Sequence, residues 1–268
     1  MRVVGVVALN VFRESVRDKV LYSLVVFAVL MIAASYLIGQ LSAGQDLKII
    51  KDLGLAAISV FGLAIAIFIG IGLVWKEVER RSIYALLVKP LTRGQFICGK
   101  YFGLVLTLVV NVAVMTAAFY LVLMYMARGV LPEVRAAWPA PAADPAMLKA
   151  ILLIVVELML VTAIALFFST FSSPFLSAVL TAGLWVIGHF NDDLRNFEKV
   201  LHSRVASAVA KGAYYILPNF AAFDVKAQVV HAQPVPMSYV GLTTLYGLVY
   251  VAFVLVGAVA VFARRDFR

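Results

Sequence analysis

Long runs of apolar residues, separated by shorter polar segments, dominate the pattern along this chain. Six of these runs are long enough, or nearly so, to cross the hydrocarbon core of a membrane, which takes about 20 residues of helix. They cover residues 20–41, 53–75, 101–127, 147–171, 174–190 and 239–263. The pattern therefore predicts an all-α, polytopic integral membrane protein with six transmembrane helices in a single transmembrane domain over residues 1–268.

The fourth and fifth runs are joined by a very short connection, Ser172-Ser173-Pro174. Proline cannot continue a preceding helix without the loss of a backbone hydrogen bond. We therefore expect these two runs to form a tight helical hairpin, in which the fifth run is the shortest of the six.

The composition agrees with lipid as the solvent. Of the 268 residues, 64% are apolar and 14% are charged, and the mean hydropathy is +1.01. A soluble domain carries about 25% charged residues, so a single soluble core could not bury this much apolar surface. The net charge of +9 would suggest nucleic acid in a soluble chain. The positions of Lys and Arg give that charge another meaning, and we expect no nucleic-acid partner.

Basic residues gather in three short segments that the six spans put on one side of the membrane. These residues are Arg2, Arg13, Arg17 and Lys19, then Lys76, Arg80, Arg81, Lys89, Arg93 and Lys100, and finally Arg264, Arg265 and Arg268. The short segments on the other side carry only Lys48, Lys51, Arg128 and Arg135, with Lys149 at a boundary. The positive-inside rule then places both termini in the cytoplasm and residues 191–238 outside. The expected location is the inner (plasma) membrane of a bacterial or archaeal cell.

The segment before the first span is amphipathic. Its polar residues Asn10, Arg13, Glu14 and Arg17 fall on one helical face, and Val4, Val7, Ala8, Val11 and Phe12 cover the other. This spacing predicts an interfacial helix over residues 1–19 that lies along the membrane surface. The alternative is an ordinary cytoplasmic extension of the first span.

The segment between the second and third spans predicts a second amphipathic helix, over residues 76–90. Ile83, Leu86 and Leu87 share one face of it, while Glu77, Glu79, Arg80 and Arg81 lie on the wet face. Pro90 ends the helix, and Thr92 and Gln95 have the spacing of a capping box that starts the next helix. An apolar-faced helix at the cytoplasmic surface is suited to receive force from a soluble partner. The alternative is a plain connecting loop.

This second segment resembles a known family. Four pieces of it are similar to the pattern E…LL…P-[VL]-[ST]-R…GK in permease subunits of type-2 ABC exporters: Glu79, Leu86-Leu87, Pro90-Leu-Thr-Arg93 and Gly99-Lys100. Ser82-Ile83 stands where that family usually has Gly-Thr. Residues 10–22, 217–220 and 264–267 resemble the branch described as permeases for multicopper-enzyme maturation, so the resemblance covers nearly the whole chain.

The resemblance implies a six-span permease that pairs with a second copy of itself or a sibling and binds two cytoplasmic ABC ATPase subunits. Residues 76–90 would be the coupling helix, residues 1–19 the connecting helix, and the outer loop 191–238 would hold amphipathic re-entrant helices. ATP and Mg²⁺ would bind to the partner ATPases, and this chain would bind no cofactor. The residues assigned to ATPase coupling are Glu77, Glu79, Arg80, Arg81, Ile83, Leu86, Leu87, Pro90 and Arg93.

Residues 94–101 nearly match the phosphate-binding pattern G-x-x-x-x-G-K-[ST]. Tyr101 cannot supply the small hydroxyl that ligates magnesium, and no buried strand precedes Gly94. We therefore expect no nucleotide site and no catalytic residue, so the chain is predicted not to be an enzyme. Gly99 and Gly103 have the spacing of small residues that lets helices pack closely.

Few polar residues lie inside the spans. An ionised carboxylate at Glu157, near the middle of the fourth run, costs several kcal/mol unless it faces protein or water or takes up a proton. Glu157 is a candidate for the substrate pathway or a dimer interface; the alternative is a structural hydrogen bond to Asn111, Thr162 or nearby backbone. Asn111 is likewise a pathway or interface candidate, with helix packing as the alternative.

His189 lies close in sequence to Asp192, Asp193 and His202. This spacing matches no metal motif, so an interfacial polar cap is the favoured interpretation and no metal ligand is assigned.

Three classes of function stay open. The first is a permease subunit of an ABC exporter, the second an accessory or scaffold subunit of a membrane enzyme complex, and the third a secondary transporter that uses Glu157 as a proton carrier. The amphipathic segment before Pro90 favours the first class over the third, because an ion-driven carrier has no ATPase to engage. The cargo is not identified by the sequence: lipid, polysaccharide, peptide and a sulfur species are all compatible.

Overall fold

The computed structural model describes residues 2–41, 45–79, 92–136, 138–190 and 217–264, together with Gly212. These residues form helices and no strand, which confirms the predicted all-α class. The helices are α1 (Arg2–Ser15), α2 (Lys19–Gln40), α3 (Asp46–Glu79), α5 (Arg93–Gly129), α6 (Pro132–Ala136), α7 (Met147–Ser169), α8 (Pro174–His189), the short 3-10 helix η2 (Ala221–Phe223), α11 (Lys226–Val230) and α12 (Met237–Arg264).

Five helices of the described residues, α2, α3, α5, α7 and α12, are long and apolar enough to cross a membrane. The polytopic membrane character is therefore confirmed, while the count of six spans stays a prediction. The fifth predicted span, residues 174–190, forms α8, which has 16 residues. Such a helix is about 24 Å long at 1.5 Å per residue, and the hydrocarbon core is about 30 Å thick.

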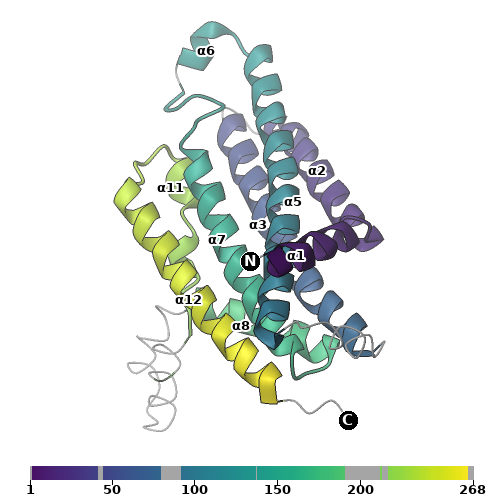
Figure 1. The fold of residues 1–268 in the computed structure, drawn as a ribbon. Coiled ribbons are helices and arrows are strands. Elements are labelled where there is room, and N and C mark those ends of the chain that lie inside the picture. Colours follow the sequence, from purple (N-terminus) through teal and green to yellow (C-terminus); the bar gives the residue numbers. More distant parts are fainter. Residues whose placement is uncertain are drawn as a thin grey trace, which may run out of the picture.

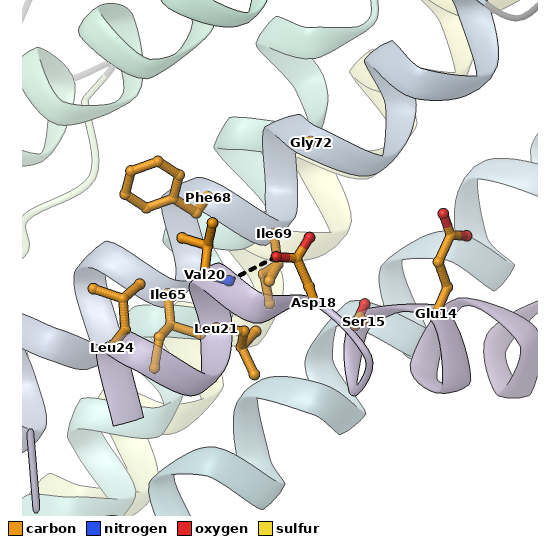
Figure 2. Close-up of a pocket in the computed structure, with 10 residues that line it drawn as sticks. All are labelled: Glu14, Ser15, Asp18, Val20, Leu21, Leu24, Ile65, Phe68, Ile69 and Gly72. Carbon is orange, nitrogen blue, oxygen red and sulfur yellow. Dashed lines mark hydrogen bonds between the residues drawn. The ribbon is translucent and has the colours of Figure 1, made fainter. Parts of the chain in front are cut away.

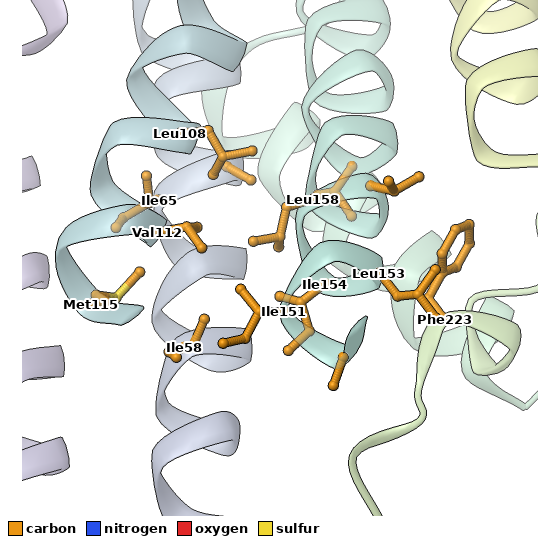
Figure 3. Packing of buried hydrophobic residues seen from close by; sticks show 14 of the residues in the cluster. Ile58, Ile65, Leu108, Val112, Met115, Ile151, Leu153, Ile154, Leu158 and Phe223 are labelled. Atoms are coloured by element: carbon orange, nitrogen blue, oxygen red, sulfur yellow. The ribbon is translucent and has the colours of Figure 1, made fainter. Parts of the chain in front are cut away.

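The long helix α7 lies at the centre of the bundle, and α3, α5, α8 and α12 pack around it (Figure 1). Its sequence is apolar on all sides, as expected for a helix with no solvated face. Figure 3 shows Ile58 of α3 and Val112 of α5 among the side chains packed beside Ile151 and Ile154 of α7. The core is thus formed by helices that are distant in sequence, and each of them packs against α7.

Small residues bring α3 close to α7. A Cβ atom at Gly62 would lie 2.5 Å from Leu158 Cδ1, and one at Gly70 would lie 2.6 Å from Ala165 Cβ. Real Cβ atoms need about 3.5 Å from such carbons, so a side chain at either position would push the helices apart. Close approach of this kind is the usual basis of helix association in membranes.

The predicted hairpin between α7 and α8 is confirmed. Pro174 occupies the first turn of α8, and the Ser173 hydroxyl accepts a hydrogen bond from Leu176 N. The Ser172 and Ser177 hydroxyls lie 2.7 Å apart across the turn. Serine before a proline at the first helical position is a strong helix start.

At the opposite end of the bundle, two lysines of long helices donate to backbone carbonyls of connecting segments. Lys51 Nζ donates to Pro141 O at 2.9 Å, and Lys149 Nζ donates to Val235 O at 2.8 Å. This end carries α6 in Figure 1, and the end of α12 lies at the other end. The segment just before α12 therefore lies beside the start of α7.

Candidate functional site

The predicted coupling segment connects two of the longest helices. α3 runs without interruption to Glu79, so the backbone at Glu77 and Glu79 continues the helix of the second span instead of starting a separate one at residue 76. α5 begins at Arg93. The other predicted coupling residues, Arg80, Arg81, Ile83, Leu86, Leu87 and Pro90, lie outside the described residues, and their roles stay predictions.

The start of α5 carries the capping box that the sequence predicts. Gln95 N donates to Thr92 Oγ1, and Thr92 N donates to Gln95 Oε1, both at 3.3 Å. Two backbone N–H groups that the helix start would leave unpaired are thereby satisfied. The position at which the coupling segment gives way to α5 is therefore fixed by local chemistry.

Residues 94–101 form part of α5 and are helical throughout. A phosphate-binding loop needs a glycine-rich turn whose backbone N–H groups point at the ligand, and these N–H groups lie inside a continuous helix. Lys100 is buried, with its Nζ 4.8 Å from the centre of the Phe96 ring. Residues 94–101 therefore lack the loop geometry of a P-loop, and the absence of a nucleotide site stays a prediction.

Arg93 joins the start of α5 to the end of α12. Its guanidinium donates to the carbonyl oxygen of Phe262 at 3.3 Å and also to that of Ala263. The Phe96 ring stacks on the Phe262 ring with centroids 5.9 Å apart. The last carbonyls of a helix have no partner within the helix, and a cation there also interacts favourably with the helix dipole. Sequence reasoning assigned Arg93 to ATPase coupling and could not foresee this contact across 170 residues.

Helix α1, which the sequence predicts to be interfacial, packs on the same part of α5 (Figure 1). A Cβ atom at Gly99 would lie 2.8 Å from Val7 Cβ, and one at Gly103 would lie 2.5 Å from the carbonyl oxygen of Ala8. The two glycines form a notch in the surface of α5, and any larger side chain at either position would collide with α1. The spacing of Gly99 and Gly103 predicts close helix packing, and the partner helix is α1.

These contacts join three pieces at one end of the molecule, which we call the cytoplasmic base: the start of α5, helix α1 that lies on it, and the end of α12 that Arg93 holds. We use that name for these three pieces below. The orientation implied by the name is the one that the basic residues predict. Any displacement of the start of α5 would be transmitted to α1 and α12, because steric contact and hydrogen bonds join them.

A second candidate site surrounds Glu157, near the middle of α7. The side chain is 3% exposed. Trp185 Nε1 of α8 donates to Glu157 Oε1 at 2.7 Å, and His189 Nε2 lies 3.7 Å from the same oxygen. The Trp185 and His189 rings also contact each other, with centroids 4.3 Å apart. A buried carboxyl group therefore receives a hydrogen bond from a neighbouring helix.

The partners that the sequence suggested for Glu157 are engaged elsewhere. Asn111 Nδ2 donates to Thr107 O at 2.8 Å, and the Thr162 hydroxyl donates to Leu158 O at 2.8 Å. Both bonds lie within one helix. The hydrogen-bond partner of Glu157 in the structure is therefore Trp185, not Asn111 or Thr162. Sequence reasoning missed Trp185 because indole groups carry no recognisable spacing signal.

The chain between residues 217 and 230 returns to the Glu157 site. Phe220 N donates to Gly188 O at 3.0 Å, and the Phe220 ring stacks on His189 with centroids 6.0 Å apart. In the same segment Lys226 Nζ lies 3.5 Å from Asp224 Oδ2 and donates to Ser59 Oγ of α3 at 3.4 Å. The Asp224–Lys226 pair thus belongs to the segment that packs on His189 through Phe220.

The Glu157 contacts also fix where α8 ends. Glu157 is 12 residues before Ser169, or about 18 Å along α7, so the end of α8 lies beside the middle of α7. The described residues resume at 217; Phe220 bonds Gly188 at the end of α8, and Val235 bonds Lys149 near the start of α7.

The described residues contain no group of three or more His, Cys, Asp or Glu side chains placed to hold a metal ion. Asp192, Asp193 and His202, which the sequence brings near His189, lie outside the described residues. His189 itself contacts Trp185 and Glu157.

Comparison with protein families gives one result of direct use. The family described as ABC-2 family transporter protein matches residues 6–190. The match covers well over half of the chain and runs from α1 to the end of α8, so it includes most of the cytoplasmic base, the predicted coupling segment and Glu157. No curated protein matches the chain with significance.

Proposed function

Since this chain belongs to the ABC-2 transporter family and is a membrane permease component of an ABC transporter, we propose that it works in an exporter driven by separate ATPase subunits. The observation that carries the proposal is the family match over residues 6–190, which includes residues 76–90 and both helices that flank them. ATP and Mg²⁺ would bind to the ATPase subunits, and this chain would supply the path through the membrane.

The cytoplasmic base supports this mechanism. A partner that pushes on residues 76–90 would act on α3 and α5 at once, because these two helices enter and leave the segment. The α1 contact at Gly99 and Gly103 and the Arg93 contact to α12 would carry the displacement of α5 to two further helices. Packed helices move as rigid bodies rather than deforming continuously, so a local push would shift the base as one unit.

The complex we propose holds two permease chains, either identical or siblings, and two cytoplasmic ATPase subunits. It would lie in the inner (plasma) membrane of a bacterial or archaeal cell with both permease termini in the cytoplasm, as the thirteen basic residues of one side favour. The resemblance to multicopper-enzyme-maturation permeases favours a cargo used in metalloenzyme assembly, such as a sulfur species. Lipid, polysaccharide and peptide are the other compatible cargoes.

We place Glu157 and Asn111 inside each permease chain instead of at an interface between two chains. Both side chains are buried within a single chain, at 3% and 8% exposure. Glu157 would hold the end of α8 and residues 217–230 in position through Trp185 and His189. A proton-coupled secondary transporter, the alternative use of Glu157, would need neither a coupling segment nor an ATPase.

The proposal is tested by purification of the tagged chain from its native membranes in a mild detergent. We expect an ABC ATPase to copurify in a one-to-one ratio, and ATP hydrolysis by the complex to depend on this chain. Recovery within an enzyme complex that lacks any ATPase would instead favour the scaffold function. The two outcomes are exclusive, because a scaffold has no use for a stoichiometric ATPase.

A further inference from the structure

A cavity of about 200 Å³ lies between the α1–α2 junction and α3 (Figure 2). One end of it is polar and is formed by Glu14, Ser15 and Asp18 of the junction. The other end is apolar and is formed by side chains of α2 and α3, among them Leu24, Ile65 and Phe68. The cavity is therefore amphipathic and lies at the point where the interfacial helix turns into the first span.

The polar end offers hydrogen-bond acceptors to a ligand. Ser15 is 4% exposed, and its hydroxyl finds no hydrogen-bond partner among the described residues. A buried hydroxyl without a hydrogen-bond partner costs free energy, so a ligand that supplies a partner for Ser15 would be stabilised here. Asp18 is held in place because its Oδ1 accepts from Val20 N at 3.0 Å, and Glu14 is exposed beside it. The Glu14 carboxylate and the Ser15 hydroxyl, next to Asp18, suit a cation that carries N–H donors.

The apolar end leads to the surface that lipid covers. Phe68 is 59% exposed, and Val20 and Phe27 on the outer face of α2 are 50% and 59% exposed. A volume of 200 Å³ equals that of roughly seven water molecules at about 30 Å³ each. The cavity can hold a small head group, and any long chain attached to it must lie along this exposed apolar face.

The charges around the cavity favour a zwitterion. Arg17 and Lys19 are exposed in the same junction, where their positive charges can bind a phosphate. Glu14 and Asp18 line the cavity and would repel an anion that entered it. A quaternary ammonium has no N–H to donate to Ser15. We propose that this cavity binds the primary ammonium of a phosphatidylethanolamine head group, with the phosphate beside Arg17 and Lys19 and the acyl chains against α2 and α3.

Such a lipid would bridge the α1–α2 junction and α3, and would thereby hold α1 in place. The inference does not depend on the exporter proposal, because it concerns only the chain and its bilayer. A basic side chain of a soluble partner could offer an ammonium too. The lipid is favoured because the cavity opens past Phe68 toward the apolar face of α2 and α3.

The chain offers a substitution that narrows the cavity from a position where a Cβ atom has open space. A Cβ atom at Gly72, which lines the cavity, would meet no atom within 4 Å. Gly72→Leu therefore blocks the space by its side chain alone. Gly241 of α12 also has open space around a Cβ atom and is exposed, so Gly241→Leu is the matched control. Glu14→Gln removes a charge from an exposed position and leaves the fold untouched.

The test is native mass spectrometry of the full chain, delipidated in detergent and then given equal amounts of dioleoyl phosphatidylethanolamine, phosphatidylcholine and phosphatidylglycerol. We expect the wild type and Gly241→Leu to retain phosphatidylethanolamine in preference to the other two by about tenfold, the effect of one charge-assisted hydrogen bond. Gly72→Leu and Glu14→Gln should lose this preference.

Three results would overturn the assignment. They are equal retention of the three lipids by the wild type, a preference for phosphatidylglycerol, and a phosphatidylethanolamine preference that survives both Gly72→Leu and Glu14→Gln. If Glu14→Gln weakens copurification of an ATPase while lipid retention stays unchanged, the cavity belongs to the protein partner and not to the lipid.

Discussion

The notch at Gly103 gives the sharpest prediction about the cytoplasmic base. In Gly103→Ala the new Cβ would lie 2.5 Å from Ala8 O and 2.7 Å from Val11 Cβ. Ordinary contact begins near 3.5 Å, so α1 must withdraw by about 1 Å. Neither obstacle is the end of a flexible side chain, since one is backbone and the other is a Cβ atom. Overpacking of this kind costs about 1–3 kcal/mol.

A second effect of the same substitution has the opposite sign. Alanine is favoured over glycine inside a helix by about 1 kcal/mol. Gly241→Ala in α12 should show this gain alone, because a Cβ atom there meets no atom within 4 Å. The difference between the two variants therefore isolates the steric cost, which we place at about 1–3 kcal/mol.

The assay is thermal unfolding of both purified variants in the same detergent. For chains of 150–250 residues, 1 kcal/mol shifts Tm by about 2–4 °C, so Gly103→Ala should melt about 2–12 °C below Gly241→Ala. A Gly103→Ala protein as stable as Gly241→Ala would refute the contact between α1 and α5.

Three further predictions concern the buried carboxylate, the end of α12 and the topology. Trp185→Phe removes the donor to a buried carboxylate and should destabilise the protein by about 1–2 kcal/mol; an unchanged Tm would mean that this hydrogen bond is unimportant. Arg93→Met should speed hydrogen exchange of the last turn of α12 because its carbonyls lose a cap, whereas equal exchange in wild type and variant would contradict the contact. In intact cells a membrane-impermeant thiol reagent should label Lys199→Cys and leave Cys98 unlabelled, with labelling of Cys98 in inverted vesicles as the control; labelling of Cys98 in intact cells would reverse the orientation.

Features of the fold that depend on neighbouring residues could be predicted from the sequence. The apolar runs, the Thr92–Gln95 capping box and the turn at Pro174 are local, since each depends on residues only a few positions apart. The notch at Gly99 and Gly103 was visible as a spacing, but its partner helix was not.

Features that depend on distant contacts could not be predicted. Arg93 and its acceptor Phe262 are 169 residues apart, and no pattern in a single sequence links a basic residue to a helix end so far away. Trp185 is the partner of Glu157 because the α7–α8 hairpin brings the two helices side by side, which only the folded geometry decides. The same geometry places the end of α8 beside Glu157 and residues 217–220, halfway along α7.

The central claim is that residues 76–90 couple this permease to an ATPase, and Leu87→Ala tests it most directly. If Leu87 sits in a pocket of the ATPase, its side chain contributes about 1.5–3 kcal/mol to binding, or roughly a tenfold to hundredfold change in affinity. The matched control is Leu242→Ala in α12, whose side chain is 68% exposed and faces lipid in the proposed arrangement. The measurement is ATP hydrolysis by the reconstituted complex as a function of ATPase concentration. The account predicts that Leu87→Ala shifts the concentration for half-maximal hydrolysis upward by at least tenfold, while Leu242→Ala leaves it unchanged; identical curves for the two variants would contradict it.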